Sequence, residues 1–337
     1  MQALLISTYE MGRQPFGLAS PAAWLRAAGW DVACADLAKE RLDQARVRSA
    51  DLIAFHLPMH TATRLALPVI ELVRRLNPAA RLCAYGLYAP LNGDALRALG
   101  VQDVLGGEFE EDLVAIAKAL PANAGSPPVR TAGPDDPPYA PPRQPLGRRP
   151  GPFRLRARLR RTAIASAKAV GPGASLPKLH FLVPDRSGLP PLSAYATLQT
   201  SDGHRRLVGY TETSRGCRHL CRHCPVVPIY NGQFRVVQPE VVLADIDAQI
   251  ATGAEHITFG DPDFFNGPTH AMRIVEALHA AHPAVSYDVT IKVEHLLKHR
   301  ALLPRLRDSG CAFVTSAVES VDDAVLALLE KGHTRQD

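Results

Sequence analysis

The sequence predicts an α/β protein in which an open, Rossmann-like sheet is followed by a partial barrel of the (βα)6 type. Three features predict this class. Short apolar runs alternate with amphipathic helical patterns over residues 1–120, a proline-rich segment follows at 121–206, and four further strand–helix repeats occupy 207–337. Strands that alternate with helices favour parallel sheets with helical crossovers.

The first unit, residues 1–120, combines short buried strands with longer helices. Strands are expected at 3–7, 31–35, 52–55, 81–85 and 101–105, and helices at 15–28, 62–76, 92–99 and 109–120. Gly29 and Gly100 stand where a left-handed helix cap is expected. No GxGxxG motif follows the first strand, so a nicotinamide-binding domain is not expected.

Residues 121–206 are predicted to be a linker with a short basic helix at 153–170. Between 121 and 191 lie 16 of the 29 prolines, too many for a compact core. Residues 129–170 carry ten Arg or Lys and two Asp, an excess larger than the net charge of +5 of the whole chain. Basic charge therefore belongs to the connector, where a solvated helix is favoured over contact with phosphate or nucleic acid.

The second unit, residues 207–337, repeats the strand–helix pattern with longer spacing. Strands are expected at 207–212, 256–259, 285–291 and 311–317, and helices at 239–252, 268–281, 299–309 and 322–330. Consecutive βα units with right-handed crossovers begin a barrel. Because four strands would leave an unpaired edge, we expect a chain truncated after the fourth βα unit.

The composition indicates in which cellular compartment the protein is expected and whether its cysteines form disulfides or bind a metal. No apolar run approaches the ~18 residues of a membrane span, and the N-terminus lacks the pattern of a secretory signal, so a cytoplasmic protein without a membrane partner is expected. Six cysteines in a chain of 337 residues do not make a disulfide scaffold. Three of them crowd into eight residues, which indicates a metal site instead.

The crowded cysteines are Cys217, Cys221 and Cys224, spaced CxxxCxxC directly after the first predicted barrel strand. Barrel active sites form at the carboxyl ends of strands. Three thiolates can each bind one iron of a cubane cluster and leave the fourth iron open. A zinc site would need a further ligand such as His219 or Cys311, and Cys311 is expected to be a buried apolar residue; a purely structural or electron-transfer cluster is the other alternative.

CxxxCxxC in this position resembles the radical S-adenosylmethionine (SAM) superfamily. The resemblance implies a [4Fe-4S] cluster on the three cysteines and SAM on the open iron. An electron, supplied by a partner such as flavodoxin or ferredoxin, would then cleave SAM to a 5′-deoxyadenosyl radical. For SAM contacts the resemblance points to residues in the loop and at the ends of the second, third and fourth strands: His223, Asp261, Asp263, Lys292, Ser316 and Glu319.

A Rossmann-like domain before such a barrel resembles the cobalamin-binding subgroup of this superfamily. Within that subgroup the chain resembles the radical SAM proteins with a CUAEP or CCAEP tail. The stretches 106–110 and 183–186 are similar to that subgroup. The cobalt-ligating Asp-x-His-x-x-Gly motif is absent, since residues 7–12 contain no histidine. Cobalamin would lie at the carboxyl edge of the sheet. The residues expected around it are Tyr9, His56, His60, Tyr85, Gly86, Gly107 and Glu108.

These features predict a cobalamin-dependent radical SAM enzyme that transfers a methyl group to an unreactive carbon of a small molecule or peptide. A radical rearrangement or ring contraction without methyl transfer, and a non-catalytic truncated iron–sulfur protein, are the alternatives. A tRNA methylthiotransferase would need a second three-cysteine cluster, but only Cys34 and Cys83 precede the linker. A nucleic-acid partner is therefore not expected.

Overall fold

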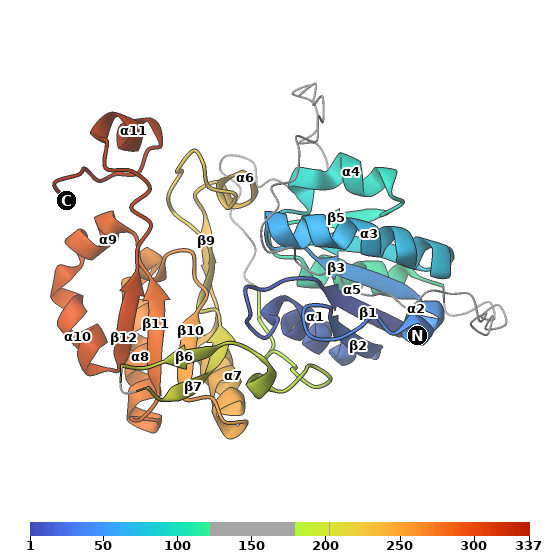
Figure 1. Ribbon diagram of the computed structural model, residues 1–337, viewed down its shortest axis with the longest axis horizontal. Coiled ribbons are helices and arrows are strands. Elements are labelled where there is room, and N and C mark those ends of the chain that lie inside the picture. Colours follow the sequence, from blue (N-terminus) through green and yellow to red (C-terminus); the bar gives the residue numbers. More distant parts are fainter. Residues whose placement is uncertain (122–178, 202) are drawn as a thin grey trace.

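The computed structural model describes residues 1–121, 179–201 and 203–337. Two α/β units lie side by side, the N-terminal one in blue to teal and the C-terminal one in yellow to red (Figure 1). The Rossmann-like class predicted for the first unit and the curled, barrel-like class predicted for the second are confirmed. No helix in the described ranges is long and apolar enough to span a membrane.

The first unit is a five-stranded parallel sheet of order β2-β1-β3-β4-β5 with helices on both faces (Figure 1). Along β1, Leu4 and Ile6 enter one core and Ala3 and Leu5 the other, so both faces of this strand are buried. The strands are β1 Gln2–Ser7, β2 Asp31–Asp36, β3 Leu52–His56, β4 Arg81–Tyr85 and β5 Asp103–Leu105. The helices are α1 Phe16–Ala27, α2 Gln44–Ser49, α3 His60–Leu76, the 3-10 turn η1 Pro90–Asn92, α4 Gly93–Ala98 and α5 Glu110–Ala119.

The second unit is a curled sheet of order β12-β11-β10-β7-β6, in which only β6 is antiparallel to its neighbour. Its strands are β6 Thr197–Gln199, β7 Arg205–Thr211, β10 His256–Phe259, β11 Ser286–Thr290 and β12 Cys311–Thr315. Its helical segments are η2 Leu192–Ala194, α7 Pro239–Ala251, η3 Phe264–Asn266, α8 Pro268–Ala281, α9 Val293–Lys298, η4 Arg300–Leu302, α10 Leu303–Asp308 and α11 Asp323–Leu328.

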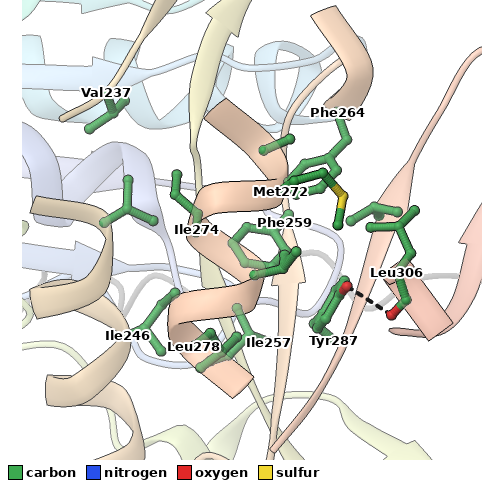
Figure 2. Close-up of a cluster of buried hydrophobic side chains, with 14 of the residues drawn as sticks. Val237, Ile246, Ile257, Phe259, Phe264, Met272, Ile274, Leu278, Tyr287 and Leu306 are labelled. Carbon is green, nitrogen blue, oxygen red and sulfur yellow. Dashed lines mark hydrogen bonds between the residues drawn. The ribbon is translucent and has the colours of Figure 1, made fainter. Parts of the chain in front are cut away.

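Apolar packing between the curled sheet and its helices forms the core of the second unit. Figure 2 shows Phe259 and Tyr287 of the sheet in one cluster with Ile274 and Leu278 of α8, and the Tyr287 hydroxyl donates to the Leu306 carbonyl oxygen at 3.1 Å. The alternate residues of β10 and β11 point to the other face, where the His256 ring contacts Asp288 Oδ1 at 2.9 Å. This polar inner face and apolar outer face are those of an open barrel wall.

The helix predicted at 299–309 differs from the structure. Over these residues the 3-10 turn η4 and the short helix α10 replace it, and the separate helix α9 ends just before them at Lys298. Pro304 is the reason, because proline is tolerated in the first turn of a helix but not inside one. Cys311, expected to be buried, is only half-buried because β12 lies at the edge of the sheet.

Residues 179–201, the end of the predicted linker, pack against both units. Leu179, Phe181 and Leu192 are buried in the second core, and the Tyr195 hydroxyl donates to Asp36 Oδ2 of the first unit at 2.9 Å. Burial raises the pKa of Asp36 to about 6. This stretch therefore helps to hold the two sheets together. The basic helix predicted at 153–170 lies outside the described residues.

Candidate active site

The three-cysteine loop is held by a small antiparallel hairpin, β8 Ser214–Gly216 and β9 Phe234–Val236, that the sequence patterns did not reveal. The Cys217 amide donates to the Gln233 carbonyl oxygen at 3.1 Å and closes the base of the loop. A short helix, α6 Val227–Tyr230, completes the loop after the third cysteine. Both ends of the loop are thereby anchored close to the carboxyl end of β7.

The three thiols are unpaired and differ in exposure. Cys221 is buried, and Cys217 and Cys224 are half-buried. Burial raises the pKa of Cys217, so its proton is retained unless a positive centre replaces it. The Cys217 sulfur lies 3.7 Å from Asn266 Oδ1, which also accepts the Arg218 amide at 3.1 Å. The loop thus presents three free sulfur ligands on a short, anchored segment.

Asp261 is used to hold the chain that leads into the loop. Its carboxylate accepts the Thr213 amide at 3.0 Å, the Thr213 hydroxyl at 2.7 Å and the Ser214 hydroxyl at 2.5 Å. Burial raises the pKa of this carboxyl against those hydrogen bonds. The carboxylate is 2% exposed and fully engaged, so Asp261 positions β8.

Asp263 lies between two imidazoles. Its Oδ2 atom is 2.7 Å from His295 Nδ1 and 3.3 Å from His219 Nε2. Burial opposes ionisation, but the two imidazoles outweigh it and lower the pKa of Asp263. Lys292 Nζ contacts His219 Nδ1 and Glu294 Oε2, both at 2.9 Å. Residues from the loop, β10 and α9 therefore form one polar cluster.

Across the loop, His223 meets the segment that follows β12. Its Nε2 atom lies 3.0 Å from Glu319 Oε1, and Lys331 Nζ lies 3.5 Å from the same oxygen. These contacts lower the pKa of Glu319 against a small burial effect. Ser316 Oγ is buried, and the part of the chain that the structure describes gives it no hydrogen-bond partner. His223 and Glu319, both predicted for SAM, are thus adjacent, whereas Asp263 belongs to a different cluster.

A cavity of about 180 Å³ joins the cysteine loop to the carboxyl edge of the first sheet. The first unit contributes residues at or after the ends of β1, β3, β4 and β5. The second unit contributes β7, β8, the segment at α6 that follows the third cysteine, and the turn after β10. The lining residues are Glu10, Phe16, Gly17, His56, Pro58, Gly86, Leu87, Gly107, Phe109, Tyr210, Glu212, Ser214, Arg215, Gly216, Val226, Tyr230, Gly260 and Pro262. A ligand at this edge would therefore face the loop that carries the three cysteines.

A family model described as the radical SAM superfamily matches residues 211–337. The matched region begins at the end of β7 and contains all three cysteines. Residues 211–337 are a radical SAM domain. The resemblance predicted from CxxxCxxC is confirmed.

Curated relatives match parts of the chain. The hopanoid C-2 methylase of Rhodopseudomonas palustris (strain TIE-1) is 22% identical over 147 residues, which are 42% of this chain and 27% of that protein. The tRNA-2-methylthio-N(6)-dimethylallyladenosine synthase of Desulfitobacterium hafniense (strain Y51) is 40% identical over 53 residues, 16% of this chain and 12% of that protein. Each match covers only a minor part of the relative.

Two solved structures share the fold over 99% of this chain, which spans 62% of theirs. Both are the radical SAM methyltransferase TsrM from Kitasatospora setae. The structure with tryptophan substrate and the SAM analogue aza-SAM has a TM-score of 0.60 at 16% identity. The structure with cobalamin and a [4Fe-4S] cluster has a TM-score of 0.61 at 15% identity. The radical SAM domain and the sheet before it are therefore arranged as in a known two-part fold.

Of the residues predicted to surround cobalamin, some line the cavity and others lie away from it. His56, Gly86 and Gly107 line the cavity that faces the radical SAM domain. His56 Nδ1 is 2.6 Å from Glu10 Oε1. The fully buried Tyr85 instead donates its hydroxyl to the Gly17 carbonyl oxygen at 2.7 Å, below the cavity wall.

The other three of these residues do not line the cavity. His60 is exposed and Tyr9 is half-buried outside it. Glu108 lies 3.6 Å from Arg215 and 3.7 Å from Arg235, and burial raises the pKa of its carboxyl. Glu108 therefore belongs to the contact between the two units.

Arg215, like His295 described above, is a residue at this site that sequence reasoning missed. It precedes Gly216 and Cys217, and its guanidinium contacts Glu110 Oε1 at 2.6 Å and Glu212 Oε2 at 3.0 Å. Its charged group also lies 4.9 Å from the ring centre of Phe181. This buried cation links the radical SAM domain to α5 of the first unit. The available signal was a charged residue two positions before the first cysteine, but its closest partner, Glu110, is 105 positions away in sequence.

Proposed function

We propose that this protein is a cobalamin-dependent radical SAM enzyme that transfers a methyl group to an unreactive carbon of a small molecule or peptide. The observation that carries this proposal is the cavity shared by the cysteine loop and the carboxyl edge of the first sheet. The fold shared with TsrM supports it, since TsrM has been solved with cobalamin and a [4Fe-4S] cluster. The partial match to a hopanoid methylase also favours methyl transfer.

The cysteine loop fits a [4Fe-4S] cluster by its donor set. Cys217, Cys221 and Cys224 are three free thiols on an anchored loop. Among the described residues, the His, Cys, Asp and Glu side chains whose ligand atoms converge within 4.8 Å are His219, Asp263 and His295, a set without any cysteine. Sulfurs that serve three different irons need not converge on one ion, whereas those of a zinc site must. When bound, such a cluster supplies the electron that cleaves SAM.

The sheet edge fits cobalamin by its position and its glycines. Gly86 and Gly107 adopt φ values of +106° and +67° there, and they let a ligand approach the backbone closely. The cavity of about 180 Å³ is smaller than the ~300–1,000 Å³ usual for ligand sites. We therefore expect it to receive one edge of a corrin, with the rest on its open side. Cobalamin, when bound, supplies a carrier for the methyl group.

The chain's own residues then have separable tasks. Asp261 holds Thr213 and Ser214, which set the direction of the hairpin before Cys217. His223 and Glu319 are the exposed pair beside the cysteine loop that remains available to polar groups of SAM. Electrons would come from a flavodoxin- or ferredoxin-type partner, in agreement with the need of the cluster for a one-electron donor.

The cluster is tested by anaerobic reconstitution with iron and sulfide. Wild type is expected to bind about four irons per chain, and Cys217→Ala to lose most of them, because three thiolates are the cluster's protein ligands. Cys311→Ala, which removes a half-buried thiol outside the loop, is the matched control and should load normally. SAM should change the wild-type electronic spectrum and yield 5′-deoxyadenosine with reductant. Equal iron in wild type and Cys217→Ala would contradict the proposal.

Cobalamin binding is tested by gel filtration of the full chain after incubation with hydroxocobalamin. Wild type should retain corrin absorbance, and Leu87→Trp should retain at least tenfold less at limiting ligand because an indole would fill the cavity. Leu91→Trp is the matched control, since Leu91 is 49% exposed on the neighbouring turn and does not line the cavity. A wild type without corrin absorbance, or equal losses in both variants, would remove cobalamin from the proposed function.

A further inference from the structure

Beside the cysteine loop, two imidazoles and a carboxylate meet from three separate elements. His219 lies inside the loop, Asp263 follows β10, and His295 is on α9. His219 Nε2, Asp263 Oδ2 and His295 Nδ1 all lie within 4.8 Å of one another. Asp263 and His295 are more than nine-tenths buried. The radical SAM chemistry proposed above does not use this set.

The contacts within this set centre on one carboxylate oxygen. Asp263 Oδ2 is 2.7 Å from His295 Nδ1 and 3.3 Å from His219 Nε2, and all three side chains are mostly buried. Two ligands on one ion, each about 2.1 Å from it at 90–109°, lie about 3.0–3.4 Å apart. The 3.3 Å contact lies in this range and the 2.7 Å contact is 0.3 Å below it, so a small outward shift of the His295 ring would let both imidazoles and the carboxylate bind one ion.

Neighbouring groups orient the carboxylate for this role. Asp263 Oδ1 accepts the Phe265 amide at 3.2 Å and the Lys292 amide at 3.4 Å, which leaves Oδ2 directed toward the imidazoles. Metal-binding histidines donate their other ring N–H to a carboxylate or carbonyl. Glu294 Oε2, 3.7 Å from His219 Nδ1, is the carboxylate in place to accept it. Lys292 would then keep its contact with Glu294 and release His219.

We propose that His219, Asp263 and His295 bind one divalent first-row transition-metal ion such as Zn²⁺ or Fe²⁺, at a mononuclear site distinct from the three cysteines. Two imidazoles and one carboxylate suit such ions better than Mg²⁺ or Ca²⁺, which prefer oxygen ligands. Three protein ligands leave at least one coordination position open. The site would also tie the cysteine loop to the ends of β10 and β11. It does not depend on SAM cleavage or cobalamin.

The first test uses the chain with Cys217, Cys221 and Cys224 all replaced by alanine, so that no thiolate in the loop can bind the probe. Titration with ZnCl₂ is expected to show one equivalent bound. Asp263→Asn or His295→Ala in the same background should weaken binding at least 100-fold. His282→Ala is the matched control, because His282 contacts Asp247 at 2.7 Å in an exposed pair without a second imidazole. Circular dichroism checks that each variant is folded.

The second test keeps the cysteines and uses Co²⁺ on the wild-type chain, in case the alanine background does not fold. Nitrogen and oxygen ligands give weak visible bands, whereas thiolates add intense charge-transfer bands in the near ultraviolet. Asp263→Asn should remove the weak bands alone, and Cys221→Ala the charge-transfer bands. Absence of a stoichiometric site in both proteins, or binding unchanged by Asp263→Asn and His295→Ala, would overturn the proposal. Failure of cluster assembly or of SAM cleavage would leave this result unaffected, so the two proposals fail separately.

Discussion

Replacing Arg215 with methionine is expected to lower the free energy of unfolding by about 3–5 kcal/mol, because removing one partner of a buried ion pair leaves the other charge uncompensated. Arg215 is 7% exposed and Glu110, its closest carboxylate, is fully buried. Glu108 and Glu212 face the same guanidinium, so three carboxylates would lose their common cation. Urea unfolding monitored by circular dichroism measures the loss. Iron loading should fall with it, since Cys217 is two residues away.

Arg81→Met provides the control for this prediction. Arg81 also pairs with a carboxylate through two hydrogen bonds, to Asp103 at 2.7 and 3.0 Å, but its side chain is 41% exposed. Pairs at the surface contribute about 0–1 kcal/mol, so a small change is expected. Adding Glu110→Gln to Arg215→Met should restore part of the lost stability by removing the stranded charge. Equal effects for Arg81→Met and Arg215→Met would contradict the role of Arg215 between the units.

Gly216→Ala is expected to cost about 2 kcal/mol or more and to prevent normal iron loading. Gly216 has φ +79°, a conformation that costs an L-residue roughly 1–2 kcal/mol. A Cβ at this position would lie 2.4 Å from the Gln233 carbonyl oxygen and 2.6 Å from Tyr230 Cδ1. Neither group can yield easily, because Gln233 O accepts the Cys217 amide and Tyr230 is buried. Moving the Gln233 carbonyl aside would break its hydrogen bond with the Cys217 amide and displace the backbone of the first cysteine.

Gly203→Ala separates the two contributions to this cost. Gly203 has φ +85°, but among the described residues nothing lies within 4 Å of a Cβ built there. This variant should lose only the backbone term, about 1–2 kcal/mol, and should load iron normally. Thermal denaturation and iron content per chain compare the two proteins. If Gly216→Ala loads iron as well as Gly203→Ala does, the close packing of the hairpin is not required for the site.

Local signals predicted the parts of this protein whose partners are near in sequence. The five parallel strands of the first sheet and the principal helices are predicted by apolar periodicity and by glycine and proline positions. The short helix α2 was missed, and the helix boundary near Pro304 was misplaced. The hairpin β8–β9 escaped prediction because each strand has only three residues and spans no full apolar period.

The candidate site shows the same limit. Cys217, Cys221 and Cys224 are predicted as cluster ligands from their spacing alone, because ligands on one loop are close in sequence, and their role stays a prediction. By contrast, Asp261 and Asp263 share one tripeptide and one predicted role, yet one holds Thr213 and Ser214 while the other meets His219 and His295. These partners of each carboxylate lie more than 30 positions away in the sequence, so no local pattern shows which carboxylate supports the hairpin and which meets the histidines.

Spacing, apolar periodicity and the order of the two units are properties of neighbouring residues, and these sufficed for the α/β class and the radical SAM domain. Burial and charge pairing between distant residues are not properties of neighbouring residues, so the sequence pattern does not reveal them. The meeting of Arg215 with Glu110, and of His219 with Asp263 and His295, arises only when strand ends from different parts of the chain converge at one edge. Such contacts form because a buried charge must find a partner wherever the fold places one.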